Sequence, residues 1–560
     1  MVHPDRRGQR RAGRAGHAPR RRQRNLGGLL SPRHHGYVHA GRAVGASTRG
    51  SAPRALLRRR GGRGGGGAAG PGRAAEPPAG CGAYQRRERP PGGRPPQHAA
   101  RLAVDEGQLS GGPTGGRREP PPPRRHLPRI RHPRHRGRPA HGGGRARHRK
   151  GVRDVRLGTT ELAPQVASGI ARAGGLAIEV GTVPTPALYF ATHTVDVDGG
   201  IQITGSHNPP EFNGFKMVLA GEAIHGHDIQ GLRGLIEGGQ IPDRPGGRRE
   251  AHPGLLRRYA DAIVERNAPL ARRVKAVVDC GNGVTSLVAI ETLRRLGAEV
   301  VPLFAESDGT FPNHHPDPTV LENLRDLQAA VPRERAELGI AFDGDGDRIG
   351  TVDEQGRVVF GDQLLVLLGR DLVQRQGTGH PVIFDVKCSD VLRRELERAG
   401  LRPVMWKTGH SLIKQKMKEL NAPLAGEMSG HMFFGGDWYG FDDALFAAAR
   451  LLHYLAERGG PLSRLLADLP TTVSTPEIRI ACPDDRKFDI VEQAAAHFSR
   501  SYPVSRLDGV RITFPDGWGL LRASNTQPVL VLRFEAQSEQ ALAANRQEVE
   551  DWLRAAGVRP

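Results

Sequence analysis

The character of the chain changes abruptly near Val152, and this boundary decides which residues can form a folded protein. Residues 1–150 hold 36 of the 82 Lys and Arg residues but only 6 of the 59 Asp and Glu residues, a net charge of +30. The rest of the chain holds 46 basic and 53 acidic side chains, a net charge of −7. The positive sign of the formal net charge of +23 therefore comes from the first segment. The second segment has the nearly equal numbers of acidic and basic side chains of an ordinary globular protein.

Residues 1–150 are rich in Gly, Pro, Arg and Ala and have almost no periodic apolar pattern. Such a segment cannot bury enough apolar surface to offset its conformational entropy, so we predict that it is disordered. One interpretation is an Arg-rich arm that binds nucleic acid through phosphate neutralisation. A targeting peptide is a second interpretation, but the segment lacks both an apolar core and a sustained amphipathic pattern.

A third interpretation, which we prefer, is that residues 1–150 come from a GC-rich gene that is translated in the wrong reading frame over this segment. Lys150 is the single Lys among the 36 basic residues, and Arg, Gly, Pro and Ala all have GC-rich codons. Residues 128–137 can be encoded so that reading one nucleotide later gives Arg-Glu-Tyr-Asp-Ile-Arg-Gly-Ile-Val. Many other back-translations exist, so the sequence permits a frame error without proving one.

After Val152, short β-branched runs alternate with amphipathic helical stretches. Residues 274–280 and 298–304 predict strands on either side of a helix, and residues 381–409 repeat the pattern of strand, helix and strand. This recurrence indicates α/β domains with mostly parallel sheets, in which ligand sites lie at the carboxyl ends of strands. From Thr471 the pattern predicts a smaller α+β domain, and residues 470–476 predict a linker.

The cysteines and the apolar runs indicate in which cellular compartment the protein is expected. Four widely spaced cysteines form no CxxC pair and no disulfide framework, which fits a reducing environment: Cys81, Cys280, Cys388 and Cys482. No apolar run approaches the eighteen or more residues that a membrane span needs. We therefore expect a soluble cytoplasmic protein with no membrane partner.

The segment ITGSHNPP places Ser206 on a constrained turn, because Asn208-Pro209-Pro210 forces an extended or turn conformation after it. A solvated loop serine is the ordinary interpretation. A hydrolase nucleophile needs G-x-S-x-G between a strand and a helix, which this segment lacks. A serine that carries a phosphoryl group instead needs a metal and cations, and Lys216 follows ten residues later.

A second loop, FDGDGDRIG, places Asp343, Asp345 and Asp347 directly after an apolar strand. Three hard oxygen ligands in one short loop suit Mg²⁺ or Ca²⁺. An EF-hand would need Gly at the sixth loop position, where this chain has Arg348, and it would need helical flanks. Arg348 instead places a permanent cation beside the metal, as phosphoryl transfer requires.

Two further loops contain candidate binding residues. In GEMSGH, Glu427, Ser429 and His431 are spaced two apart, and an extended segment would turn all three to one side. Glu and Ser can bind vicinal hydroxyls, and His can transfer a proton near neutral pH, although a core histidine is the simpler interpretation. In RASNTQP, a guanidinium, two hydroxyls and an amide gather in one turn, which suits either a phosphate cradle or an ordinary turn: Arg522, Ser524, Asn525 and Thr526.

These four loops, in this order, resemble the α-D-phosphohexomutase superfamily, and above all its bacterial phosphomannomutase/phosphoglucomutase group. TGSHNPPEFNGFKM is similar to the phosphoserine loop, DGDGDR to the metal loop, GEMSGH to the sugar-specificity loop and RASNTQP to the phosphate-binding loop. The stretches GTVPTPALYFA, DVKC, WKTGHSLIKQKMKE and GFDDALFAAARLL match the same group. The resemblance covers residues 152–560.

The resemblance implies four domains: three related α/β domains at 151–255, 256–368 and 369–470, and a C-terminal α+β domain of TATA-binding-protein-like topology at 471–560. It implies that Ser206 is phosphorylated and that one Mg²⁺ is held by Asp343, Asp345, Asp347 and a phosphate oxygen on Ser206. The phosphoryl group would move between the 1- and 6-positions of mannose or glucose phosphates through a 1,6-bisphosphate, which also serves as activator.

The same resemblance implies roles for the remaining site residues. Lys216 and Arg348 would neutralise charge during transfer, and His431 would be a candidate general base. The sugar site would be lined by Lys387, His410, Glu427 and Ser429. The phosphate that does not react would be held by Arg522, Ser524, Asn525 and Thr526. The partners would be hexose phosphates and not nucleic acid, and we expect a monomer.

One departure from the family is serious. Its members open with a strand that contains Tyr-Asp-Ile-Arg-Gly, whose Arg acts at the catalytic centre, and the written sequence has no such motif. The shifted frame of residues 128–137 would supply it. We therefore expect the written chain to be poorly active and a frame-corrected chain to be active. The alternatives are a phosphoglucosamine mutase, which GEMSGH disfavours, and an Arg-rich nucleic-acid-binding protein.

Overall fold

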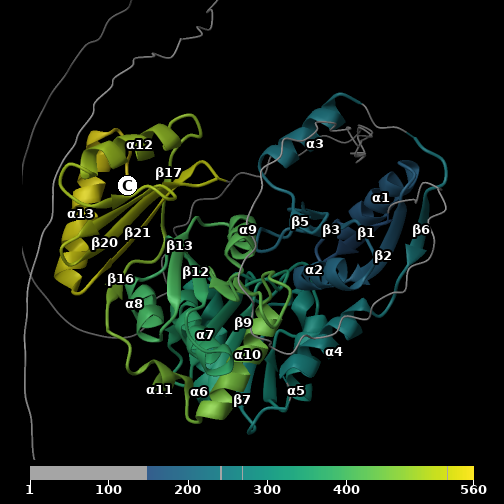
Figure 1. The fold of residues 1–560 in the computed structure, drawn as a ribbon, viewed down its shortest axis with the longest axis horizontal. Helices are drawn as coiled ribbons and strands as arrows, with labels where there is room; N and C mark the ends of the chain where they lie inside the picture. The colour runs from purple at the N-terminus through teal and green to yellow at the C-terminus, as the bar shows by residue number, and fades with distance from the viewer. Residues whose placement is uncertain (1–147, 240–242, 268, 526) are drawn as a thin grey trace, which may run out of the picture. The chain divides into compact units, whose positions relative to one another are not determined.

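The structure is a computed structural model, and it describes residues 148–560 except 240–242, 268 and 526 (Figure 1). The predictions of disorder and of a frame error for residues 1–147 lie outside these described residues. The prediction of disorder is wrong for residues 148–150, because they begin strand β1 (His148–Arg153). This strand lies between two parallel neighbours, β2 and β3, so its backbone is held on both sides.

The first domain is a six-stranded mixed sheet in the order β5-β4-β3-β1-β2-β6. Its elements after β1 are α1 (Thr159–Arg172), β2 (Leu176–Thr182), α2 (Thr185–Thr194), β3 (Gly199–Thr204), β4 (Gly214–Leu219), β5 (Glu222–Ala223), α3 (His227–Glu237) and β6 (Arg248–Ala251). Strands β3 and β4 are antiparallel, and the loop between them contains Ser206. Strand β3 is almost entirely buried, so it gives this loop a fixed base.

The second domain is a five-stranded sheet in the order β11-β10-β9-β7-β8, in which β7, β8 and β9 are parallel. Its elements are α4 (Leu255–Asn267), β7 (Lys275–Asp279), η1 (Val284–Leu287), α5 (Ala289–Arg295), β8 (Glu299–Leu303), η2 (Leu321–Leu324), α6 (Arg325–Arg333), β9 (Leu338–Phe342), β10 (Ile349–Asp353) and β11 (Val358–Val359). The apolar run LGIAF forms β9, which is buried at every position, and the aspartate loop follows it.

The third domain has a four-stranded sheet in the order β13-β12-β14-β15. Its elements are α7 (Gly361–Gln376), β12 (Pro381–Asp385), α8 (Asp390–Arg398), β13 (Arg402–Trp406), α9 (His410–Leu420), β14 (Leu424–Gly426), β15 (Met432–Phe434), α10 (Ala444–Arg458) and α11 (Leu462–Leu466). The expected domain boundary at 368/369 falls inside α7. That helix contacts α8 and β14, so it belongs to the third domain.

The C-terminal domain is an antiparallel sheet in the order β16-β21-β20-β19-β18, with β17 also paired to β21. Its elements are β16 (Val473–Ser474), β17 (Ile478–Ala481), α12 (Lys487–Phe498), β18 (Val504–Ser505), β19 (Val510–Phe514), β20 (Gly517–Ala523), β21 (Val529–Ala536) and α13 (Glu539–Ala555). Both helices contact β20, as Figure 1 shows. The predicted linker at 470–476 is partly wrong, because residues 473 and 474 form β16 and pair with β21.

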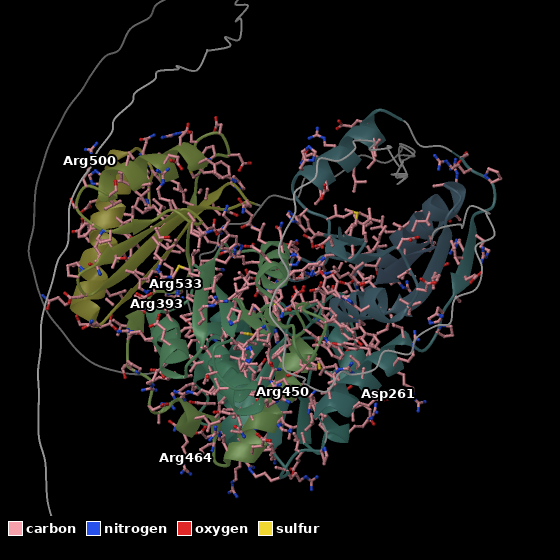
Figure 2. All side chains as sticks on the ribbon, in the orientation of Figure 1. Asp261, Arg393, Arg450, Arg464, Arg500 and Arg533 are labelled. Atoms are coloured by element: carbon pink, nitrogen blue, oxygen red, sulfur yellow. The ribbon has the colours of Figure 1, made fainter. Side chains whose placement is uncertain are left out.

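Several buried apolar clusters lie within and between the domains. One buried cluster contains residues of the first three domains, among them Tyr189, Tyr259 and Phe446, whereas the C-terminal domain has its own cluster around Phe498 and Phe534. Arg450 of α10 is buried (Figure 2), and its guanidinium lies 2.5 Å from an oxygen of Asp371 on α7. In the described part of the chain, no helix is both long and apolar enough to span a bilayer.

Candidate active site

Ser206 lies in the loop after β3 and has a left-handed backbone conformation, with φ of +48°. Residues with a Cβ rarely adopt this conformation, so the loop must be held in place by its surroundings. The Ser206 amide donates to the Thr204 hydroxyl at 2.9 Å, and the Ser206 hydroxyl donates to Asp343 Oδ2 at 2.9 Å. The predicted phosphate carrier therefore contacts the predicted metal loop, although 137 residues separate the two in sequence.

Asp343, Asp345 and Asp347 lie in the loop between β9 and β10 and are fully buried. An oxygen of each lies within 4.8 Å of an oxygen of the other two. Asp343 Oδ1 accepts three backbone N–H groups of the loop, from residues 346, 347 and 348, at 2.9 to 3.1 Å. Lys216 of β4 spans the other two carboxylates, at 2.7 Å from Asp345 Oδ2 and 2.5 Å from Asp347 Oδ2.

The aspartates of the cluster differ in how their surroundings shift the pKa. Burial, together with the charges of the other two aspartates, raises the pKa of Asp343 well above its usual value. For Asp347, burial is outweighed by Lys216 and His431, which together hold its pKa well below the usual value. The three carboxylates hold the pKa of Lys216 well above its usual value despite burial. A group of carboxylates that repel one another in this way is suited to a divalent cation.

The donor set fits Mg²⁺. Asp345 Oδ1 is buried and has no hydrogen-bond partner among the described residues, and Asp347 Oδ1 has only His431 Nε2 nearby, at 3.2 Å. Buried oxygens without partners are costly, and a hard cation with oxygen ligands would satisfy them. Thr185 at the start of α2 holds Asp345 in place through a 2.5 Å bond to Oδ2. Asp343, Asp345 and Asp347, with an oxygen on Ser206, could therefore hold the ion, and this ligand set stays a prediction.

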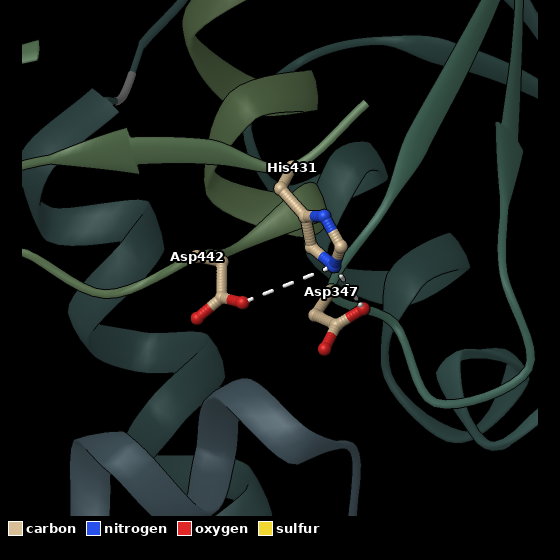
Figure 3. A group of neighbouring side chains, drawn as sticks. All are labelled: Asp347, His431 and Asp442. Carbon is tan, nitrogen blue, oxygen red and sulfur yellow. Dashed lines mark ion pairs between the residues drawn. The ribbon is translucent and has the colours of Figure 1, made fainter. Parts of the chain in front are cut away.

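His431 joins the metal loop to the sugar loop (Figure 3). Its Nε2 lies 3.2 Å from Asp347 Oδ1 and 4.0 Å from Asp442 Oδ2, and its Nδ1 lies 2.7 Å from Glu427 Oε2. Burial and the charge of Arg348, whose Nε lies 3.3 Å from the same Nε2, lower the pKa of His431, but Asp347 and Glu427 outweigh them and raise the pKa to about 9. The carboxylates on both sides of the ring therefore favour the imidazolium form at neutral pH. The expected role as a general base remains a prediction.

The expectation that Glu427, Ser429 and His431 lie in an extended segment is wrong, because they form the turn between β14 and β15. The Glu427 amide donates to the His431 carbonyl at 2.9 Å, which closes the turn. The turn still brings the three side chains together, since Ser429 Oγ lies 3.1 Å from His431 Nδ1. Spacing in the sequence therefore predicted the right neighbours for the wrong reason.

Backbone contacts connect this turn to the metal loop. The amide of Ile349 donates to the carbonyl of Gly430 at 3.1 Å, and the amide of Ala444 donates to the carbonyl of Gly346 at 3.3 Å. Gly430 has φ of +92°, and a Cβ there would lie 2.3 Å from the carbonyl oxygen of Ile349. The close approach of the two loops therefore requires glycine at this position.

Lys387 and His410 lie beside this turn. Lys387 follows β12, is 8% exposed, and lies between Asp385 at 3.8 Å and Glu477 at 3.4 Å. His410 begins α9, and its ring stacks on His431 with centroids 5.8 Å apart. Burial and the nearby Lys414 lower the pKa of His410 to about 3, so this ring is neutral. The two neighbouring histidines thus differ in charge, one a cation and one a neutral donor or acceptor.

The predicted phosphate cradle lies between β20 and β21. Arg522 is 7% exposed and lies 3.2 Å from Asp508, which also accepts the Thr408 amide of the third domain at 3.0 Å. Ser524 is buried and Asn525 is exposed. Thr526 lies outside the described residues.

Four domain families match consecutive parts of the chain. They are described as phosphoglucomutase/phosphomannomutase α/β/α domain I at residues 152–240, domain II at 257–356, domain III at 360–473 and the C-terminal domain at 477–551. A phosphomannomutase/phosphoglucomutase of Pseudomonas aeruginosa is 48% identical over 392 residues, which are 70% of this chain and 84% of that protein. The chain belongs to the phosphoglucomutase/phosphomannomutase family.

Further family members support the assignment. A phosphoglucomutase of Neisseria gonorrhoeae is 44% identical over 395 residues, which are 70% of this chain and 85% of that protein. The crystal structure of a phosphoglucomutase/phosphomannomutase family protein of Burkholderia thailandensis aligns with a TM-score of 0.68 at 45% identity, over 73% of this chain and 90% of that one. The predicted family and the predicted four-domain fold are therefore confirmed.

The family site also contains residues that the sequence did not predict. Asp442 accepts from Lys414 at 3.0 Å, and its Oδ2 lies 3.5 Å from His410 Nδ1 and 4.0 Å from His431 Nε2. His207, next to the carrier serine, pairs with Asp317 of the second domain at 2.9 Å. A buried cation, Arg156, contacts the loop of Ser206 itself. His207, Lys414 and Asp442 lie in stretches that resemble the family, but all of these contacts join separate chain segments, so residue spacing alone does not indicate them.

Proposed function

We propose that this chain moves a phosphoryl group between the 1- and 6-positions of glucose and mannose phosphates through Ser206. The observation that supports this most strongly is the Ser206 hydroxyl, 2.9 Å from Asp343 within a cluster of three buried aspartates and Lys216. The related enzymes are named for mutase activity on glucose and mannose phosphates. The enzyme is therefore an isomerase that acts as an intramolecular phosphotransferase.

In the first half of the reaction, the bond from phosphorus to the Ser206 oxygen breaks and a bond to a sugar hydroxyl oxygen forms. In the second half, the bond from the other phosphorus to its sugar oxygen breaks and the bond to the Ser206 oxygen forms again. In each half, the accepting hydroxyl loses its proton and the oxygen that gives up the phosphoryl group gains one, so protons balance over the step. His431 is placed to take part, because it holds a proton between Asp347 and Glu427. A bound Mg²⁺ would neutralise charge on the phosphoryl oxygens during transfer.

The remaining residues bind and orient the sugar phosphate. Glu427 and Ser429 present a carboxylate and a hydroxyl to sugar hydroxyls, and Lys387 adds a buried cation beside them. Arg522, Ser524 and Asn525 would hold the phosphate that is not transferred, with Thr526 next to them in sequence. We expect a monomeric cytoplasmic enzyme that is activated by glucose or mannose 1,6-bisphosphate, with no nucleic-acid partner.

The test is turnover of the two 1-phosphates by the purified chain with Mg²⁺. We expect conversion of glucose 1-phosphate and mannose 1-phosphate to the 6-phosphates, measured by coupling each product to a dehydrogenase. Glucosamine 1-phosphate is the comparison substrate, because its turnover would identify the rival mutase. A chain that converts neither hexose phosphate but converts the amino sugar would contradict the proposal. The ratio of kcat/KM for the two hexoses gives the sugar preference.

The frame hypothesis makes a separate prediction. If residues 1–150 are translated out of frame, the written chain lacks one cation of the catalytic centre, and restoring the frame should raise kcat by at least about 10-fold. In support, the alignment covers 84% of the Pseudomonas enzyme, and the match to domain I begins at residue 152. The measurement is kcat of the written and the frame-restored chains side by side. Sequencing the gene through codons 100–160 is independent of folding, and an unambiguous frame without a shift would refute the hypothesis.

A further inference from the structure

Arg156 has no counterpart among the catalytic groups described above, yet it is fully buried beside the loop of Ser206. Its guanidinium donates to four backbone carbonyls of that loop. One terminal nitrogen bonds to the carbonyls of Ser206 and, at 2.5 Å, Asn208. The other bonds to the carbonyls of Pro209 at 2.8 Å and Phe212 at 3.3 Å. A single side chain therefore holds both ends of the segment from 206 to 212.

Four carbonyl oxygens that point at one place repel one another, so this loop conformation needs a cation at its centre. The loop also closes tightly around the guanidinium: a Cβ at Gly205 would lie 2.7 Å from a terminal nitrogen of Arg156 and 2.5 Å from the Phe212 carbonyl oxygen. Ser206 itself is in the rare left-handed conformation, with φ of +48°. The side chain of Arg156 is thus the internal support of a strained loop.

The guanidinium is itself fixed from several sides. Asp154 Oδ2 lies 3.6 Å from Arg156 Nε, and the ring of Phe311 lies 5.0 Å from the guanidinium carbon. The same Asp154 oxygen accepts from the Thr204 hydroxyl at 2.5 Å, and that hydroxyl accepts from the Ser206 amide at 2.9 Å. Asp154 therefore orients both the cation under the loop and the amide of the carrier serine.

From these contacts we propose that Arg156 is a positioning residue for phosphoryl transfer. It sets the backbone of residues 206–212 so that the Ser206 oxygen points at the aspartate cluster, and its charge does not touch the reacting atoms. The inference rests on the proposed function of Ser206. Two terminal nitrogens donate to four carbonyl oxygens, and only a planar guanidinium has donors in this arrangement. The loop conformation therefore needs a guanidinium at this position and not merely a positive charge.

The test is Arg156→Lys, which keeps the charge but removes the fork. We expect kcat for glucose 1-phosphate to fall by about 30- to 100-fold with KM changed by less than about threefold, because the sugar and phosphate contacts lie on other loops. The control is Arg172→Lys on α1, an exchange of the same type at an exposed ion pair with Asp243, which should leave both constants unchanged. A wild-type chain that turns over and an Arg156→Lys variant with the same kcat would overturn the inference and leave the proposed function intact.

A readout that needs no turnover is amide hydrogen exchange. In Arg156→Lys we expect exchange of the amides between 205 and 213 to rise by about tenfold or more, while β20 and β21 of the C-terminal domain keep their protection. Unchanged exchange in the loop, or an equal rise throughout the molecule, would contradict a positioning role. If Arg156→Lys does not fold, Asp154→Asn is tested instead by kcat for glucose 1-phosphate and by amide exchange of the loop. This substitution removes the charge that orients the guanidinium and keeps the shape of the side chain. Unchanged kcat and unchanged loop exchange in that variant would also overturn the inference.

Discussion

Replacing Ser206 with Ala is expected to lower kcat by at least about 10⁴-fold, because the oxygen that carries the phosphoryl group is removed and no alternative carrier takes its place. In the structure this oxygen lies 2.9 Å from Asp343 Oδ2, whereas the neighbouring His207 is turned away and paired with Asp317. Folding should be unaffected, because alanine removes only the hydroxyl of a partly exposed side chain. The measurement is turnover of glucose 1-phosphate by the purified variant.

Mass spectrometry separates loss of the carrier from other causes of inactivity. After incubation with glucose 1,6-bisphosphate, the wild-type chain should gain one phosphoryl group on the peptide that contains Ser206, and Ser206→Ala should gain none. The matched control is Ser286→Ala, which removes a hydroxyl that bonds to Gly283 and Ser307 in the second domain, and which should keep both activity and phosphorylation. An active Ser206→Ala variant would show that the carrier is a different residue.

Asp345→Asn is expected to lower kcat by roughly 10³-fold and to abolish the stabilisation of the fold by Mg²⁺. The substitution keeps the shape of the side chain but removes one of three carboxylates that would bind the ion. Mg²⁺ at 100 times its Kd should stabilise the wild-type fold by about 2.7 kcal/mol, and this gain should be absent in the variant. Thermal unfolding with and without Mg²⁺ measures the loss independently of activity.

Without metal, Asp345→Asn removes repulsion among the three carboxylates but also the 2.7 Å ion pair between Asp345 and Lys216, so we expect no rise in the Tm of the metal-free protein. Glu354→Gln is the control: Glu354 would be the twelfth residue of an EF-hand loop, yet it binds Ser463 of α11 and lies outside the cluster. This variant should keep the Mg²⁺ response of the wild type. A response lost in Glu354→Gln and kept in Asp345→Asn would refute the assignment of the metal loop.

Residues whose positions are encoded within a few neighbours could be placed from the sequence. Asp343, Asp345 and Asp347 follow a buried strand at alternate positions, so their convergence required nothing beyond the strand and its loop. The turn at Ser206 could be predicted for a similar reason, because the prolines after it restrict its backbone, whereas its role as a phosphate carrier came from the resemblance and stays a prediction. Buried strands such as β9 are short apolar runs that local patterns indicate, but β6 is a polar, exposed strand that they do not.

Contacts between distant segments could not be predicted in this way. Asp317 reaches His207 because the first and second domains pack against one another, and Lys414 reaches Asp442 because α9 and the segment after β15 pack together within the third domain. The turn of GEMSGH was mistaken for an extended segment. Two residues on each side of Gly430 are too few to show whether apolar side chains recur with the period of a strand or of a helix. The support of the Ser206 loop by Arg156 was missed because a buried arginine in a polar stretch looks like any surface arginine.

The backbone bond from Ile349 to Gly430 joins the metal loop to the sugar loop, and the bond from Ala444 to Gly346 joins the metal loop to the start of α10. The aspartate cluster and the Glu427 turn therefore lie side by side in the structure. A mutase must nevertheless bring first one end and then the other end of its hexose to the same serine. If the proposed bisphosphate intermediate forms, it has to turn end over end between the two phosphoryl transfers, because one serine serves both ends of the hexose. Under the proposed function, the site must therefore retain this intermediate between the two transfers.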